Sequence, residues 1–227
     1  MNKPGRFKLL AAEIILWIIS LIVLIPYLLV ILTSVKNSSE AGLFQLNIPS
    51  EIHIIDNYKV VFEKGKVFKG FYNSTFITVI SVALILICSA LVSFYIARVK
   101  SRTSSFLYMF FVMGITAPIS LVTTYQLLKI IGLIDTKPGV ILVYCGILIP
   151  LSVFIYVGFI KTIPLEMDEA AIIDGSSPYR LFIHIILPLL KPVTFTNLIL
   201  VFMGIWNDAQ IVLFFLSNSD EWTMPLN

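Results

Sequence analysis

Residues 161–191 read KTIPLEMDEAAIIDGSSPYRLFIHIILPLLK, the densest mixture of charged and apolar residues in the chain. Apolar runs border this stretch on both sides, at 138–160 before it and at 192–215 after it, and only Asp208 brings a charge into them. A helix of about 20 apolar residues crosses the hydrocarbon core of a membrane. We therefore interpret residues 161–191 as a polar connector between two membrane crossings.

The composition of the whole chain is that of a membrane protein. Of its 227 residues, 58% are hydrophobic and 13% are charged, whereas soluble domains carry about a quarter charged residues. Long apolar runs recur along the chain, and they predict an all-α integral membrane fold with residues 1–227 in a single transmembrane domain. The five predicted transmembrane helices lie at 9–35, 71–97, 104–128, 138–160 and 192–215, with a long loop at 36–69.

The distribution of Lys and Arg predicts the orientation in the membrane, because cations near helix ends are retained on the cytoplasmic side. Basic residues cluster before the first predicted helix, between the second and third, and in the connector. We therefore place the N-terminus and the connector in the cytoplasm and the 36–69 loop outside. The clusters are small and form no continuous basic stripe, so nucleic acid is not expected as a partner.

The first half of the connector has the signals of a short helix of about three turns. Pro164 suits the first turn, and acidic residues follow it where the helix dipole is positive. Gly175 can adopt the left-handed conformation that ends a helix. A second helix is predicted to start at Pro178 and to lie along the membrane surface, with Pro188 and Pro192 breaking or kinking it before the next crossing.

The order of motifs in this region resembles that of a known family. Glu169-Ala170-Ala171, Asp174-Gly175, Ile186-Leu187-Pro188 and Pro192 resemble the EAA loop of permeases from binding-protein-dependent ABC importers. Three further motifs resemble the carbohydrate-uptake branch of this family, in particular the second permease of the maltose type. They are Pro164-Leu165-Glu166, Trp206-Asn207-Asp208 and Thr223-Met224-Pro225-Leu226.

The resemblance implies a multi-pass permease of the bacterial cytoplasmic membrane that takes up a sugar or oligosaccharide by alternating access. Implied partners are a second permease in a heterodimer, a cytosolic ATPase dimer that binds ATP and Mg, an extracytoplasmic solute-binding protein and membrane lipid. The implied ATPase-coupling residues are Glu169, Ala170, Ala171, Asp174, Gly175 and Pro188. Family members have six crossings, so we expect a sixth helix and a natural chain that continues past Asn227.

Mechanically, a short helix parallel to the membrane can dock in a cleft of the ATPase. Ala170 and Ala171 would allow close approach of the backbones, and Glu169 would accept a hydrogen bond from a basic or backbone N–H partner. Spacing alone leaves a second interpretation open, in which the connector has no coupling role and the two alanines only favour a helix.

The sequence contains no signature of an enzyme. The Gly-x-x-x-x-Gly-Lys-Ser/Thr phosphate loop does not occur, so ATP hydrolysis would need a separate subunit. His53 and His184 have no ligand residues at metal-binding spacing, and no serine nucleophile motif or catalytic carboxylate pair is found. We therefore predict a transport subunit that binds no cofactor or metal and has no catalytic residue.

The polar residues at helix ends allow more than one interpretation. Asp208 either caps or hydrates a helix end at the outer interface, or it lines a translocation cavity together with Trp206 and Asn207. Asn73 and Ser74, at the start of the second predicted helix, are expected to be solvated. The alternative function is an ion-coupled secondary transporter driven by Asp208, which would normally have several buried ionisable groups or broken helices. A non-transporting scaffold would not explain the ordered motif.

Overall fold

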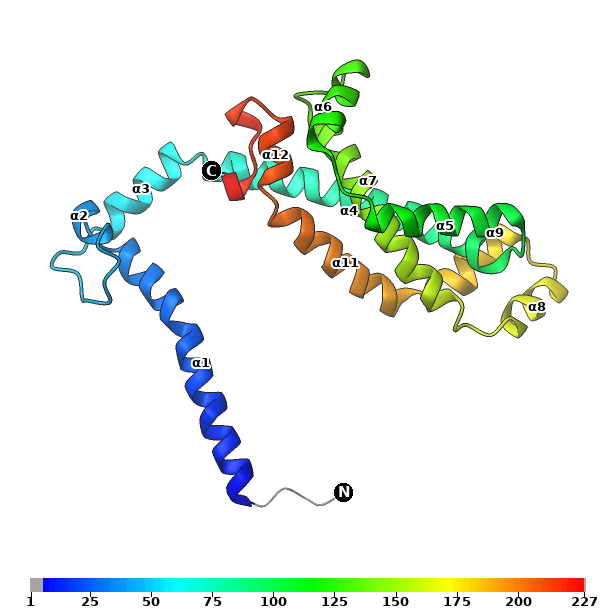
Figure 1. Ribbon diagram of the computed structural model, residues 1–227, viewed down its shortest axis with the longest axis horizontal. Coiled ribbons are helices and arrows are strands. Elements are labelled where there is room, and N and C mark those ends of the chain that lie inside the picture. Colours follow the sequence, from blue (N-terminus) through cyan, green and yellow to red (C-terminus); the bar gives the residue numbers. More distant parts are fainter. Residues whose placement is uncertain (1–5, 227) are drawn as a thin grey trace. The chain divides into compact units, whose positions relative to one another are not determined.

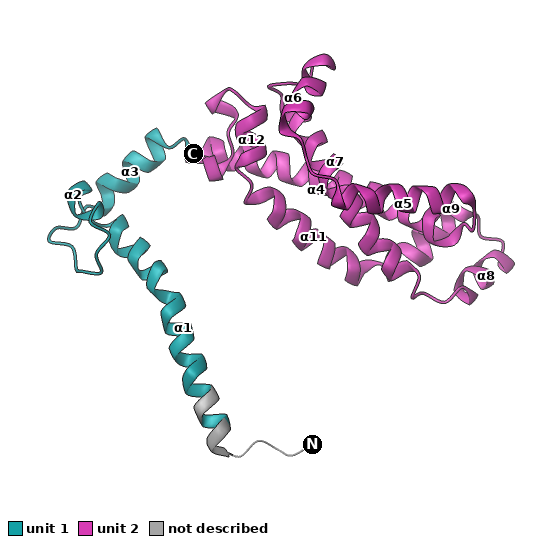
Figure 2. Ribbon diagram, viewed as in Figure 1, with its two compact units in different colours: residues 1–66 teal, residues 67–227 magenta. Residues whose placement is uncertain are grey.

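The computed structural model describes residues 6–226, with the side chains of residues 9, 10 and 13–226. This described part of the chain is helical and contains no strand. It divides into two compact units, residues 1–66 and 67–227, which we describe separately (Figure 1, Figure 2).

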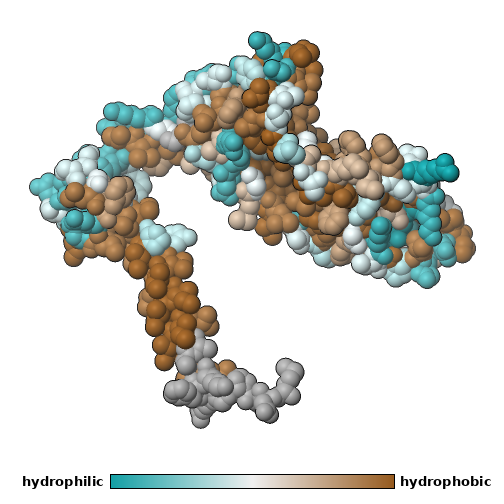
Figure 3. Space-filling model, viewed as in Figure 1, coloured by the Kyte–Doolittle hydropathy of each residue, from teal (hydrophilic) through white to brown (hydrophobic). Residues whose placement is uncertain are grey.

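The first unit consists of a long apolar helix followed by a folded loop. Helix α1 (Arg6–Ser34) has 29 residues, and its large apolar side chains are exposed, as the brown surface along it in Figure 3 shows. An apolar helix that its own chain does not bury is suited to contact with lipid. The loop that follows contains α2 (Ser38–Ala41) and α3 (Ile54–Lys64).

Two polar side chains hold this loop to the end of α1. The buried Lys36 ammonium donates to the Gln45 carbonyl and to Asn47 Oδ1, each at 2.6 Å. Asn57 Nδ2 donates to the carbonyls of Ser34 and Lys36 at 2.9 and 2.8 Å, so it satisfies acceptors that the helix end leaves open. The loop is therefore an ordered element.

The second unit is built around α4 (Val67–Arg98), α7 (Lys137–Ile160) and α11 (Lys191–Trp206). Small polar residues of α4 face the interior, and Ser93 Oγ donates to the Val153 carbonyl of α7 at 3.1 Å. Small residues allow close approach of transmembrane helices. The main apolar core includes Ile77, Ile85, Val140, Tyr144, Val201, Ile205, Val212 and Phe215.

Side-chain hydrogen bonds join α7 to α11 at two levels and to the break after α11 at a third. Since these groups lie in apolar helices, each bond satisfies a polar group that would otherwise be costly to bury. The pairs are Tyr144 with Asp208 at 3.0 Å, Ser152 with Asn197 at 3.2 Å, and Tyr156 with Thr194 at 3.0 Å.

The prediction of one continuous helix at 104–128 is wrong. The structure has α5 (Arg102–Thr116) and α6 (Leu121–Ile130), with an angle of 120° between them. Pro118 disfavours the helical conformation at the preceding residue, and Ala117 is extended with φ −70° and ψ 123°. Ser120 then caps α6 by accepting from the Thr123 amide.

The helix predicted at 192–215 is also interrupted. Helix α11 ends at Trp206, and α12 (Gln210–Phe215) starts after a short break that contains Asp208. Before α11 the chain forms α9 (Pro178–Leu181), a π-helical segment η1 (Phe182–Ile186) and α10 (Leu187–Leu189). The predicted kink near Pro188 and Pro192 is confirmed, because this segment meets α11 at 72°. The wider π turn lies just before Pro188, which cannot donate to a helical carbonyl.

The C-terminal segment folds back onto the start of α4. It contains two 3₁₀ turns, η2 (Ser219–Glu221) and η3 (Met224–Leu226). Asn73 Nδ2 donates to the carbonyls of Asp220 and Trp222, both at 3.0 Å, and Ser74 Oγ accepts from the Met224 amide at 2.8 Å. Asn73 and Ser74 are buried, so the expectation that they are solvated is wrong.

Within residues 6–226, length and composition identify three continuous helices able to cross a membrane, at 13–34, 67–98 and 137–160. The two bent pairs, α5 with α6 and the Pro178–Leu189 segment with α11, raise the number to as many as five if each pair forms one span. The described chain is therefore an all-helical protein with three to five candidate spans.

Candidate functional site

The connector contains the predicted short helix. Helix α8 (Glu166–Ile173) starts two residues after Pro164, with Leu165 as N-cap, so it is shorter than the sequence suggested. Gly175 has φ +80° and ends it as predicted. The Ser176 amide donates to the Ala171 carbonyl and the Gly175 amide to the Ile172 carbonyl, both at 2.9 Å, which is the Schellman pattern of a left-handed helix stop.

The two alanines of α8 lie in different environments. Ala171 is buried in a cluster with Ile163, Leu181 and Phe182, whereas Ala170 is exposed. Exposed groups on the helix and at its end include both charged and apolar side chains. They are Glu166, Met167, Glu169, Ile172, Ile173 and Asp174. The surface available to a partner therefore contains Glu169 and Ala170, while Ala171 holds the helix to its own chain.

A buried ion pair attaches α8 to the end of α4. Arg98 Nε lies 2.7 Å from Asp168 Oδ2, and Nη2 donates to Asp168 Oδ1 at 3.2 Å. Both side chains are only 10% exposed. The same guanidinium donates from both Nη atoms to the Ile163 carbonyl at 3.2 Å. Two segments of the connector are thereby bound to one residue of α4.

Sequence reasoning missed this pair, because Arg98 was counted only as a cation that sets orientation. The available signal was the spacing of Asp168 and Ala171, three residues apart and therefore on one face of a helix. That spacing places an acid beside a residue of the buried side. It does not identify the partner, which lies 70 residues earlier.

The rest of the connector packs against α4 and leads into α11. Phe182 of η1 contacts Phe94 of α4, with 5.2 Å between ring centroids, and Leu181 and Ile186 are buried. Pro188 is exposed in α10. Since α10 adjoins α11, the connector is joined to both α4 and α11.

A second group of predicted residues lies at the break between α11 and α12. Asp208 Oδ1 accepts from the Tyr144 hydroxyl at 3.0 Å and from the Ile211 amide at 2.9 Å, and Asp208 also lines a cavity of about 340 Å³. It thus fits both interpretations, as a helix cap and as a cavity residue. Trp206 instead stacks on Phe202 at 5.4 Å, and Asn207 donates to the Met203 carbonyl at 2.9 Å. Neither of these two lines that cavity.

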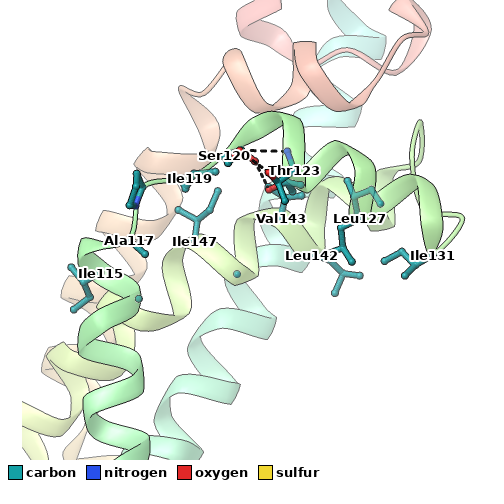
Figure 4. A pocket seen from close by; sticks show the side chains of 15 residues that line it. Ile115, Ala117, Ile119, Ser120, Thr123, Leu127, Ile131, Leu142, Val143 and Ile147 are labelled. Carbon is teal, nitrogen blue, oxygen red and sulfur yellow. Dashed lines mark hydrogen bonds between the residues drawn. The ribbon is translucent and has the colours of Figure 1, made fainter.

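The elbow between α5 and α6 forms a larger apolar cleft against α7, of about 680 Å³ (Figure 4). Figure 4 shows Ser120 at its edge, where its hydroxyl lies 2.9 Å from Thr123 Oγ1. Ile119 and Ile147 line both this cleft and the Asp208 cavity, so the two hollows adjoin.

Comparison with known proteins places this arrangement in a family. The family model described as "Binding-protein-dependent transport system inner membrane component" matches residues 89–226. The probable starch degradation products transport system permease protein AmyC of Thermoanaerobacterium thermosulfurigenes is 33% identical over 92% of this chain and 76% of its own length. The multiple sugar-binding transport system permease protein MsmG of Streptococcus mutans is 32% identical over 100% of this chain and 83% of its own.

A solved structure has the same fold. It is a bacterial ABC transporter involved in the import of the acidic polysaccharide alginate, with a TM-score of 0.80 over 100% of this chain and 79% of that chain, at 19% identity. The family match covers the connector, the Asp208 cavity and the C-terminal segment. The chain therefore belongs to the family of binding-protein-dependent transport system inner membrane components.

Proposed function

We propose that this chain is the membrane-spanning permease subunit of an ATP-driven importer for a sugar or oligosaccharide. The observation that carries the proposal is α8, a short helix with an exposed acidic and apolar surface that a buried ion pair holds to α4. The names of relatives support the substrate class, since they are called permeases for starch degradation products, for multiple sugars, and for melibiose, raffinose and stachyose.

The assembly would contain four kinds of partner around this chain. A solute-binding protein would deliver the sugar from outside, and a second permease would complete the translocation pathway. A cytosolic ATPase dimer would bind ATP and Mg, because this sequence has no phosphate loop of its own. Membrane lipid would cover α1, whose apolar side chains are exposed.

Coupling would proceed through rigid contacts. Glu169 and Ala170, on the exposed side of α8, would dock in a cleft of the ATPase, with Asp174 and Gly175 ending the docked helix. Closure of the ATPase dimer would move α8 as a unit. The Arg98–Asp168 ion pair would pass the movement to α4, and η1 with α10, including Pro188, would pass it to α11.

The proposed orientation has the N-terminus and α8 in the cytoplasm of a bacterial cell and the 36–69 loop outside. Ser38 and Thr103 are exposed and suit a labelling test. Cysteine placed at each position, in a chain lacking Cys88 and Cys145, should react with an impermeant thiol reagent in intact cells only at position 38. Reaction at position 103 with protection at position 38 would invert the proposed topology.

Transport itself can be tested in proteoliposomes that contain the complete assembly. Uptake of maltotriose, raffinose and trehalose should require ATP and should persist when ionophores remove ion gradients. The same experiment tests ion coupling. Broken helices are typical of ion-coupled transporters, and this chain has breaks between α5 and α6 and between α11 and α12. Uptake that needs an ion gradient and no ATP would contradict the proposal, as would failure to transport any saccharide.

A further inference from the structure

The cavity at Asp208 is built from three separate parts of the chain. Ile119 and Leu121 come from the elbow between α5 and α6, and Tyr144, Ile147 and Leu148 come from α7. The third wall comes from Gly204 of α11, Asp208 in the break after it, and Gln210 and Ile211 at the start of α12. Two interrupted helices therefore meet around one cavity. The break after α11 places the carboxylate of Asp208 in the cavity wall.

The carboxylate of Asp208 is held in a fixed orientation. Tyr144, only 2% exposed, and the Ile211 amide both donate to Oδ1. Among the contacts of residues 6–226, no donor reaches Oδ2. One oxygen is thus anchored by the protein, and the other remains an acceptor at the wall of the cavity.

The remaining lining matches a particular ligand chemistry. Gln210 has an exposed amide that can both donate and accept, and Ile119, Leu121, Ile147 and Leu148 make the other walls apolar. A pyranose ring needs both kinds of surface, since its hydroxyl groups form hydrogen bonds and its C–H face packs against apolar groups. A cavity of about 340 Å³ also has room for one ring.

We propose that this cavity is a hydroxyl-binding subsite for one pyranose unit of the transported saccharide. Asp208 Oδ2 accepts from a sugar hydroxyl, the Gln210 amide binds a neighbouring hydroxyl, and Tyr144 positions the carboxylate through its hydrogen bond to Oδ1. The subsite rests on the proposed sugar-import function and adds to it the residues of this chain that contact the substrate.

Two glycines provide matched reporters for this subsite. A Cβ added at Gly204, which lines the cavity, meets no atom within 4 Å, and the same is true at Gly146, which lines the adjoining apolar cleft. We would therefore prepare Gly204→Cys and Gly146→Cys in a chain lacking Cys88 and Cys145, within the detergent-solubilised complete transporter. Leu148→Cys, on the α7 side of the cavity, is a second reporter if Gly204→Cys assembles poorly.

The measurement is the rate of alkylation by a maleimide, with and without the saccharide that the wild-type complex transports fastest. Saturating sugar should slow alkylation of Gly204→Cys about tenfold and leave Gly146→Cys unchanged. Adding Asp208→Asn should abolish this protection while keeping the helix cap, because asparagine still offers an oxygen to the Ile211 amide. The same change should lower the number of sugars moved per ATP.

Three results would overturn the subsite. One is transport at the normal rate with no protection of either cavity reporter. Another is equal protection at Gly204→Cys and Gly146→Cys, which would indicate a global conformational change. The last is protection that persists in the Asp208→Asn variant. Each of these results would be compatible with the proposed sugar import. A wild-type complex that transports no saccharide would contradict both the import function and the subsite.

Discussion

Arg98, the last residue of α4, holds the carboxylate of Asp168 in the first turn of α8 through an ion pair with a 2.7 Å contact. Both side chains are nearly buried, so the pair is little screened by solvent. Removing one partner of such a pair leaves a buried charge without compensation. The connector is therefore attached to the transmembrane helices at a point where a single substitution should separate them.

Asp168→Asn should loosen this attachment. The substitution preserves size but leaves the Arg98 guanidinium without its counter-charge, at a cost of about 3 kcal/mol. We expect a lower thermal unfolding temperature of the purified complex. We also expect the solute-binding protein to stimulate ATP hydrolysis less than it does in the wild-type complex. Glu63→Gln, at an exposed acid of α3 outside the connector, is the control and should change neither quantity. Equal behaviour of the two variants would show that the ion pair does not hold α8.

Glu169→Lys tests the exposed side of α8. The glutamate is exposed in the first turn, so its replacement should leave membrane abundance normal, apart from a loss of about 0.3 to 1 kcal/mol of favourable dipole interaction. If Glu169 accepts a charge-assisted bond from the ATPase, co-purification of the ATPase should fall. Glu63→Lys, an exposed glutamate of α3, is the matched control. Normal ATPase recovery with Glu169→Lys would contradict the docking role.

Gly175→Val tests the end of α8. Gly175 has φ +80° and free space around it, so the cost of a side chain there arises from the backbone and not from a clash. Valine should impose at least about 1 kcal/mol of strain and redirect the chain toward Pro178. Asparagine tolerates this conformation, so Gly175→Asn should retain most transport while Gly175→Val loses it. Transport lost equally in both variants would point to a need for glycine other than its backbone conformation.

Asp135 makes one contact of the C-terminal segment dependent on pH. The Ser217 amide donates to its Oδ1 at 2.7 Å, and hydrogen bonds from Ser217 lower the pKa of Asp135. Because the folded pKa lies below the unfolded value, this stabilisation is present above the unfolded pKa and is lost as the pH falls through the folded pKa. The contact should therefore hold at neutral pH and open below about pH 4.

Trp222 can report this opening, because its Nε1 donates to the Leu216 carbonyl at 3.0 Å in the same segment. In a chain with Trp17 and Trp206 replaced by phenylalanine, its fluorescence should stay constant from pH 7 to about pH 4 and change below that. Asp135→Asn should remove this transition. A transition that persists unchanged in the variant would assign the pH dependence to another group.

Predictions that depended only on a residue and its neighbours in the sequence agree with the structure in several places. Gly175 ends α8 because its conformation depends on the backbone at that residue, and Pro188 with Pro192 bends the chain because proline acts on its own helical turn. The elbow at Ala117–Pro118 had the same kind of local signal. It was missed because the surrounding run contains no charged residue, and its length was taken to predict one helix.

The sequence by itself determined the membrane class, the apolar segments and the position of the connector, since each follows from hydrophobicity over consecutive residues. Only the tertiary structure decided which side chains meet. Arg98 pairs with Asp168, Tyr144 with Asp208, and Asn73 with the carbonyls of the C-terminal segment. Each contact joins residues more than 60 positions apart, and every one depends on how helices pack. The orientation of a polar group relative to another helix is set by that packing, which periodicity along one segment does not specify.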